Sequence, residues 1–173
     1  MKMINVLVVD DHTIIRKGIH LALNETLDMR VTGEAKNGDE AIDLINRSTF
    51  DVVVLDLNLP NEDGIEILKK IKAIRPSLPV VILSMYPESE YAVRCIKNGA
   101  SGYLNKENAL KELILAIRQV STGKRFVSSD LAMQLADSLA NNRHELPHQT
   151  LSQREYQVVC LIASGKKLSD MAD

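Results

Sequence analysis

Residues 52–60 read Val-Val-Val-Leu-Asp-Leu-Asn-Leu-Pro, and this stretch decides the fold. Four consecutive aliphatic residues without a polar interruption are typical of a central strand that is buried on both faces of a parallel sheet. Asp56 follows this run directly. In open sheets of alternating strands and helices, ligands bind outside the carboxyl ends of the strands. We therefore expect Asp56 to lie at a binding crevice.

Three other short apolar runs also end on polar residues. Val9 precedes Asp10 and Asp11, Leu83 precedes Ser84, and Leu104 precedes Asn105 and Lys106. An isolated Asp-Asp pair is more often a helix cap or a solvated turn, so the prediction depends on the four strand ends in combination. Because the carboxyl ends of parallel strands meet at one edge, these polar side chains should converge in one pocket. Three carboxylates, a hydroxyl and an ammonium indicate a site for a cation and a phosphoryl group.

The first 122 residues alternate between short apolar runs and segments of helical period, which predicts an α/β fold with five parallel strands and helices on both faces. The runs at 6–9, 52–55 and 80–83 are apolar throughout and indicate central strands. Residues 29–35 mix polar and apolar side chains, and residues 101–104 are interrupted by a glycine, as suits edge strands. The predicted strand order is 2-1-3-4-5.

Local signals mark several helix boundaries. Asp63-Gly64 should open a helix whose Ile65, Leu68, Ile71 and Ile74 form one buried stripe. Asn98-Gly99 should end the fourth helix, because glycine readily adopts the left-handed conformation common at helix ends.

The chain after residue 122 is predicted to hold a linker over 123–148, with a helix near 129–139, and a second domain over 149–173. Residues 141–148 are polar and lack periodicity. Ser152 and Glu155 form a capping-box pattern that indicates the start of a helix.

The 173 residues carry a formal net charge of −2, with 45% hydrophobic and 25% charged residues, as is typical of a globular protein. This balance excludes a strongly basic chain that binds nucleic acid over its whole surface. Cys95 and Cys160 form no paired framework, so we expect a reducing compartment and two cysteines that pack as small hydrophobes. No membrane span or cleavable signal is recognisable, which predicts a cytoplasmic protein with no membrane partner.

The acidic residues of the predicted pocket need a cation. A carboxylate attacks a phosphoryl group poorly because both are anionic, and oxygen-only ligands favour Mg²⁺. Asp10 and Asp11 would supply the charge that holds Mg²⁺ beside Asp56. Lys106 can pair with a carboxylate before transfer and with a phosphoryl oxygen after it, and Ser84 can donate a hydrogen bond to that oxygen.

Two residues close in sequence to the predicted site, His12 and Tyr103, have simpler explanations than a role in it. His12 follows the acidic pair, but no second histidine is near it in sequence, so we expect it at the start of the first helix rather than as a metal ligand. Tyr103, from its pattern alone, is expected to be a half-buried aromatic residue of an edge strand.

These motifs together resemble the receiver domains of bacterial two-component response regulators. The resemblance covers about residues 4–122 and rests on Asp10-Asp11, the segment Asp56-Leu57-Asn58-Leu59-Pro60 with Asp63-Gly64, Ser84, and Tyr103 with Lys106. It implies a flavodoxin-like fold in which Asp56 accepts a phosphoryl group from a sensor histidine kinase. It further implies that Asp11, Asp56 and the backbone carbonyl of Asn58 ligate Mg²⁺ while Asp10 assists through water. Ser84 and Tyr103 would be the switch residues, and Lys106 would contact the phosphoryl group.

Residues 97–104 and 151–155 also resemble the NarL/FixJ/LuxR-type subfamily, whose output domain is a helix-turn-helix. The subfamily implies a homodimer on phosphorylation and promoter DNA as the partner of a full-length protein. The resemblance stops at Asp173, inside the second helix of that domain, so the recognition helix is missing and we expect this chain not to read DNA sequence. Glu107 stands where many receivers have proline, so a cis peptide bond should not be assumed there.

Two other function classes share part of this pattern. A phosphatase of the haloacid-dehalogenase type also uses a strand-end aspartate with Mg²⁺ and a lysine, but it needs a second acid two residues after the nucleophile, where this chain has Asn58. An interaction module that works without phosphorylation would not need the complete set of Asp10, Asp11, Asp56 and Lys106. We therefore expect a phosphoacceptor that phosphorylates itself from a donor and loses the group slowly, not a turnover enzyme.

Overall fold

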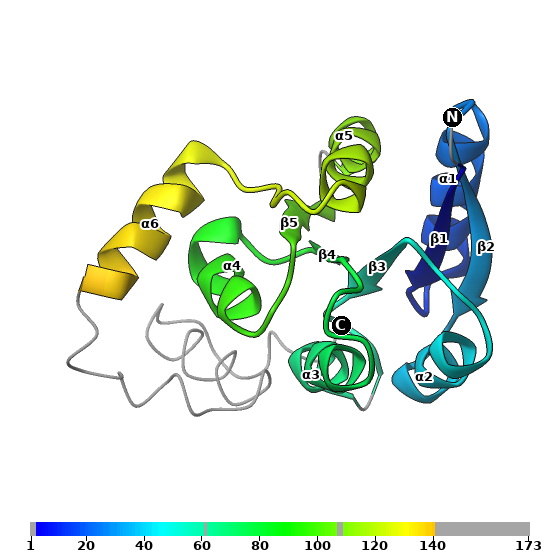
Figure 1. The fold of residues 1–173 in the computed structure, drawn as a ribbon, viewed down its shortest axis with the longest axis horizontal. Helices are drawn as coiled ribbons and strands as arrows, with labels where there is room; N and C mark the ends of the chain where they lie inside the picture. Colours follow the sequence, from blue (N-terminus) through cyan, green and yellow to red (C-terminus); the bar gives the residue numbers. More distant parts are fainter. Residues whose placement is uncertain (1–2, 61, 107–108, 141–173) are drawn as a thin grey trace, which may run out of the picture.

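The computed structural model describes residues 3–60, 62–106 and 109–140. Five parallel strands form one sheet in the order β2-β1-β3-β4-β5, which confirms the predicted fold class and strand order (Figure 1). The strands are β1 Ile4–Val9, β2 Met29–Ala35, β3 Val52–Asp56, β4 Val80–Ser84 and β5 Gly102–Asn105. The last strand is displaced by one residue from the predicted 101–104, because its pairing with β4 runs from Gly102 opposite Val81 to Asn105 opposite Ser84.

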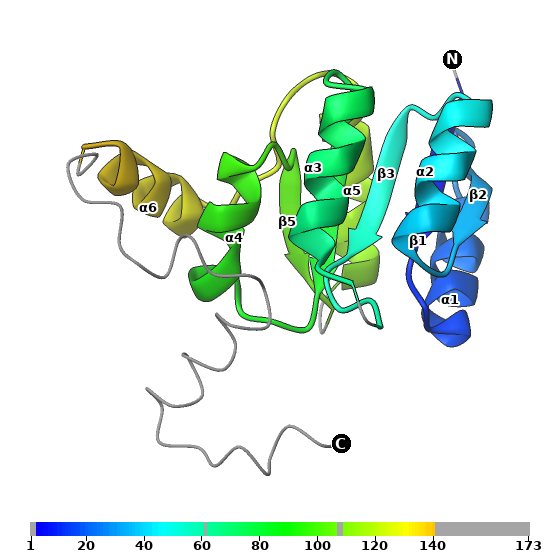
Figure 2. The same ribbon diagram turned by 90° about the horizontal axis from the view of Figure 1, so that it is seen from below.

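Helices cover both faces of the sheet. The helices are α1 Thr13–Asn24, α2 Gly38–Arg47, α3 Gly64–Ile74, α4 Glu88–Lys97, α5 Ala109–Ser121 and α6 Ser129–Ala140. Helices α1 and α5 lie on one face, while α2, α3 and α4 lie on the other (Figures 1 and 2). Each face has its own hydrophobic core, because side chains alternate across a strand: Val53 and Leu55 contact the α2–α4 side, whereas Val52 and Val54 contact the α1–α5 side.

Helix α3 departs from its predicted buried stripe. Ile65, Leu68 and Ile71 are buried, but Ile74 is 41% exposed, and Ile67 takes a buried position instead. An α-helix turns about 100° per residue, so steps of three residues fall back by about 60° each time. After three such steps Ile74 has passed the edge of the buried face.

Helix α4 ends where the sequence predicts. Asn98 is its C-cap and Gly99 follows with a φ of 100°, a left-handed conformation that suits glycine. Cys95 on this helix is fully buried in the core, as expected for a small hydrophobe.

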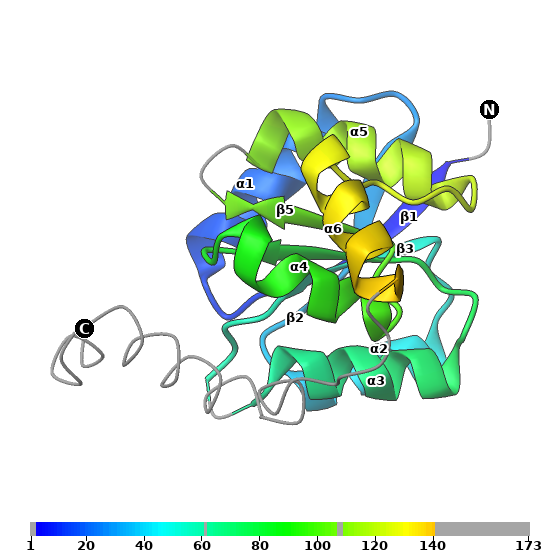
Figure 3. The ribbon, with the colours of Figure 1, turned by 90° about the vertical axis from the view of Figure 1, so that its left-hand side faces the viewer.

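Helix α6 lies against α4, at the edge of the molecule beyond the sheet (Figures 1 and 3). Leu131 is only 1% exposed and joins the core on the α4 side, and Ser128 Oγ donates a 2.7 Å hydrogen bond to Glu88 Oε1. The rest of the predicted linker and the partial helix-turn-helix domain, residues 141–173, lie outside the described residues, as does Cys160.

Within the described ranges, the longest and most apolar helices still fall short of what crossing a lipid bilayer requires.

Candidate functional site

The strand register brings the predicted site residues to one edge of the sheet. Val9 pairs with Leu55, which places Asp10 beside Asp56 at the carboxyl ends of β1 and β3. On the other side of β3, Asp56 pairs with Leu83, and Ser84 then pairs with Asn105. The convergence expected from the four strand ends is therefore present.

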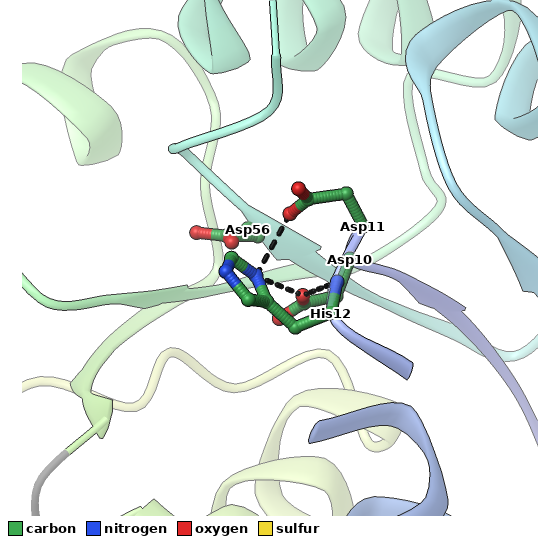
Figure 4. A group of neighbouring side chains, drawn as sticks. All are labelled: Asp10, Asp11, His12 and Asp56. Atoms are coloured by element: carbon green, nitrogen blue, oxygen red, sulfur yellow. Dashed lines mark hydrogen bonds and ion pairs between the residues drawn. The ribbon is translucent and has the colours of Figure 1, made fainter. Parts of the chain in front are cut away.

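Three carboxylates and an imidazole form the acidic part of this site, which Figure 4 draws. Asp10, Asp11, His12 and Asp56 each offer a ligand atom, and these atoms lie within 4.8 Å of one another. Asp10 and Asp56 are almost fully buried, at 2% and 1% exposure, whereas the His12 side chain is 60% exposed. His12 is the N-cap of α1, in agreement with the sequence prediction, and its ring lies 2.8 Å from Asp11 Oδ1.

Lys106 bridges the two buried carboxylates. Its Nζ donates to Asp10 Oδ2 at 2.8 Å and to Asp56 Oδ2 at 2.7 Å. The second oxygen of Asp56 accepts a 3.0 Å hydrogen bond from the backbone N–H of Asn58. Lys106 thus holds Asp56 in a single orientation, with the ammonium placed where it can contact any group bound to that carboxylate.

Burial and hydrogen bonding shift the pKa values of Asp56 and Lys106 in opposite directions. Burial raises the pKa of Asp56, and the hydrogen bonds from Lys106 and from Asn58 N–H offset part of that rise. Burial alone would lower the pKa of Lys106, but its bonds to Asp10 and Asp56 outweigh burial and raise the pKa. Lys106 therefore stays charged at neutral pH and favours the carboxylate form of Asp56.

The donor set fits Mg²⁺. Among the described residues, Asn58 Oδ1 is a buried oxygen atom that accepts no hydrogen bond, and the buried Asp11 Oδ1 has the His12 ring nitrogen, at 2.8 Å, beside it. A buried oxygen without a donor costs free energy, and a bound cation removes that cost. Three carboxylates beside one ammonium also leave an excess of negative charge, and oxygen ligands are those that Mg²⁺ prefers.

The loop from β3 to α3 positions Asn58 at the site. Asp63 caps α3 by accepting from Ile65 N–H at 2.8 Å. A Cβ at Gly64 would lie 2.6 Å from the Cα of Leu57, so only glycine allows the helix to start so close to the strand end. This close turn brings Asn58 back beside Asp56.

Arg16 is a site residue that the sequence analysis missed. Its guanidinium donates to the carbonyl oxygens of Asp10 at 2.7 Å and Asp11 at 3.1 Å, and its Nε pairs with Glu34 at 3.1 Å. The side chain is 7% exposed and occupies the buried stripe of α1 together with Ile19 and Leu23. A cation at an apolar position of a helix was the available signal.

Ser84 and Tyr103 both contact the backbone of Tyr86, in the loop after β4. Ser84 Oγ accepts from Tyr86 N–H at 3.1 Å, and Tyr103 Oη donates to Tyr86 O at 2.9 Å. Tyr103 is 3% exposed, so the expectation of a half-buried ring is wrong: α4 covers the edge strand at this point. Burial raises the pKa of the Tyr103 hydroxyl, which stays protonated and able to donate.

Comparisons with known proteins agree with this geometry. Residues 6–118 match the response regulator receiver domain. The chain is 35% identical to response regulator UvrY of Escherichia coli (strain K12) and 36% identical to response regulator GacA of Pseudomonas aeruginosa. Each alignment spans 172 residues, 99% of this chain, and covers 79% and 80% of those proteins respectively.

A solved structure of a LuxR-family two-component response regulator from Aurantimonas sp. SI85-9A1 superposes with a TM-score of 0.72 and 32% identity. That match covers 81% of this chain and 100% of the other. These similarities favour a receiver over the phosphatase that was weighed as an alternative.

Proposed function

Because this chain belongs to the response regulator receiver domain family and is a two-component response regulator of transcription, we propose that Asp56 is its phosphoacceptor. The supporting observation is a buried carboxylate that Lys106 and Asn58 N–H hold in place beside Asp10 and Asp11. A carboxylate oxygen of Asp56 attacks the phosphorus of the donor. A new O–P bond forms, the P–N bond of a phosphohistidine breaks, and the histidine nitrogen leaves with the electron pair and takes up a proton.

We assign the magnesium site to Asp11, Asp56 and the backbone carbonyl of Asn58, with Asp10 acting through water. When bound, Mg²⁺ screens the negative charges of the carboxylates and the incoming phosphoryl group. Asp10 also accepts from His12 N–H at 2.7 Å, which fixes its carboxylate at the start of α1. Lys106 exchanges its bond to Asp56 Oδ2 for one to a phosphoryl oxygen, so the positive charge stays in the pocket throughout.

The switch that follows phosphorylation involves Ser84 and Tyr103. Phosphorylation adds a charge of about −1.5 to −2 and new acceptor oxygens. Ser84 Oγ turns towards these oxygens and gives up its bond from Tyr86 N–H, so the loop after β4 loses one of its attachments. Tyr103 already lies inside the fold, bonded to Tyr86 O. Its role is therefore to hold the rearranged loop through that bond, in place of the inward rotation that a half-exposed ring would make.

The partners follow from the family. A sensor histidine kinase supplies the phosphoryl group, and the phosphorylated receiver forms a homodimer. A full-length protein with a complete helix-turn-helix binds promoter DNA. The chain is a phosphoacceptor with slow loss of the group, not a turnover enzyme.

The test is phosphorylation of the Asp56→Asn variant. The wild-type chain, incubated with acetyl phosphate and Mg²⁺, should gain one phosphoryl group in its intact mass, and Asp56→Asn should gain none because the amide is not nucleophilic. Asp11→Ala should also fail, and excess Mg²⁺ should restore part of its labelling. Asp43→Asn is the matched control, since Asp43 is exposed on α2, where it forms a 3.7 Å ion pair with Arg47. Undiminished labelling of Asp56→Asn would overturn the assignment.

A further inference from the structure

A hollow opens at the end of the sheet opposite to the acidic site. Its volume is about 400 Å³, and it lies where β4 and β5 begin, between the end of α3 and the segment that follows α5. Its lining includes Lys72, Pro79, Gly99, Ser101, Lys124 and Arg125. We call it the basic hollow, because three of these residues are cations and no residue that lines it is acidic.

Lys72 is held at the rim of the basic hollow by backbone oxygens. Its Nζ donates to Leu78 O at 2.6 Å and to Pro76 O at 3.3 Å, which leaves one of its three donors for another acceptor. The methylenes of Lys72 pack on Gly99, where a Cβ would lie 3.1 Å from its Cγ. Burial and the nearby charge of Arg125 lower the pKa of Lys72, as expected for a cation that lacks a neighbouring anion.

The segment that carries the other two cations is fixed against β5. Phe126 N–H donates to Ser101 O at 2.8 Å, and Phe126 forms a parallel bridge with Gly102. Gln119 Nε2 donates to the carbonyl of Arg125. Within the described part of the chain, neither Lys124 nor Arg125 forms an ion pair. These side chains stand beside Lys72 on a backbone that is already ordered.

A second hollow at the same end of the sheet provides a contrast. It contains Arg30, Arg47 and Arg75, and its volume is about 500 Å³. Two of its cations already have partners: Arg47 lies 3.7 Å from Asp43, and Arg30 Nε donates to Asn5 Oδ1 at 3.2 Å. The basic hollow differs in that none of its three cations has a carboxylate partner among the described residues, whereas Arg47 of the second hollow has Asp43.

We infer that the basic hollow binds a small ligand with two or more linked phosphate groups, of the pyrophosphate type. Its volume is within the range of about 300–1,000 Å³ that is usual for small-molecule sites. Arginine binds phosphate through two parallel hydrogen bonds and lysine binds it as a point charge, so linked phosphate groups offer acceptor oxygens for all three cations. This site is separate from the phosphoryl site and does not depend on the proposed function. Because its lining includes residues of α3, the residues just before β5 and the segment leading to α6, the ligand ties these parts of the chain together.

The experiment is a titration of the full chain with sodium pyrophosphate, followed by calorimetry and by amide NMR. Magnesium is left out and the ionic strength is kept low and constant, because salt screens exposed charges. Amides of Gly99, Ser101 and Lys124 should shift, whereas the amide of Asn58 should not. The double variant Lys124→Gln/Arg125→Gln should bind about tenfold more weakly or not at all. Asp56→Asn, which removes the phosphoacceptor, should bind like the wild type.

The matched control is the double variant Arg30→Gln/Arg47→Gln, which removes the same charge from the second hollow. It should stay within about twofold of the wild type. An equal loss in both double variants would show that only general electrostatic attraction is at work and would overturn the assignment. Shifts confined to Asn58 and its neighbours would also overturn it, because the ligand would then occupy the phosphoryl site. Tighter binding of duplex DNA at the same phosphate concentration would assign the surface to nucleic acid instead.

Discussion

Arg16 places a buried positive charge beneath the acidic site without touching its carboxylates. Its guanidinium donates to the carbonyl oxygens of Asp10 and Asp11, to Thr13 Oγ1 and to Glu34. These bonds fix the backbone at the end of β1, from which both acidic side chains project. Arg16 is therefore a positioning residue for the proposed magnesium site.

The variant Arg16→Lys should weaken Mg²⁺ binding by about tenfold, as is common when a group that supports a metal ligand is changed. Lysine keeps the positive charge but lacks the planar fork, so it cannot reach both carbonyls and Glu34 together. Because the charge is unchanged, the loss reports positioning alone. A titration followed by amide NMR measures the affinity.

Arg30→Lys is the matched control for that variant, since Arg30 is exposed and bonded to Asn5. It should bind Mg²⁺ like the wild type. If a folded Arg16→Lys protein retained full affinity, the orientation of Asp11 would have to come from other contacts.

From the sequence, a site residue that contributes its side chain is easier to predict than one that contributes its backbone groups. Asp10 and Asp56 follow apolar runs directly, Asp11 and Lys106 follow one residue later, and the strand register brings the four side chains together. The sequence does not predict the role of Tyr86, because its backbone N–H and C=O, not its ring, contact Ser84 and Tyr103. Every residue has those two groups, so no side-chain pattern could single it out.

At the scale of elements, α6 extends the core beyond the five-stranded unit. Val127 and Leu135 are partly buried against the same core as Leu131, and Ser128 caps the first turn by accepting from Leu131 N–H at 3.0 Å. The periodicity of residues 129–139 predicts the helix but not its docking. Docking depends on the surface that α4 offers, which lies about forty residues away in the sequence.

Leu131→Ala should lower the free energy of unfolding by about 2–3 kcal/mol, because it removes a fully buried side chain and leaves a cavity between α6 and α4. Urea denaturation of the full chain measures the change. Met133→Ala is the control, since Met133 is 66% exposed, and its effect should stay within about 0.5 kcal/mol. Equal effects of the two variants would mean that α6 unfolds independently of the sheet.

Across the whole molecule, an ion pair joins the start of β2 to the end of α5. Arg118 donates to both oxygens of Asp28, at 2.7 and 2.9 Å, over ninety positions of sequence. Arg118 holds the pKa of Asp28 below its ordinary value of 3.8, although burial opposes the shift. The Asp28–Arg118 pair therefore makes the stability of the fold depend on pH in the acidic range.

Arg118→Gln should destabilise the chain at neutral pH, and the difference from the wild type should shrink in acid. A lowered native pKa gives stability that is fully present above the unfolded pKa, near 3.8, and is lost as the pH falls through the lower native value. Melting temperatures measured from pH 7 downwards should therefore begin to approach each other once the pH falls below about 3.8. Arg47→Gln, which changes an exposed pair, should show a difference that does not vary with pH. A constant offset for Arg118→Gln would contradict the linkage.

The rate at which Cys95 reacts with a thiol reagent reports how often the fold opens around it. Burial raises the pKa of this thiol to about 12, and only a thiolate reacts quickly with alkylating reagents, so the folded chain protects it twice over. In the described part of the chain it is the only thiol, and α4 must leave the sheet before a reagent can reach it. With Cys160 replaced by serine, the labelling rate counts how often α4 opens. The same core residue that stabilises α4 thus also records its motion.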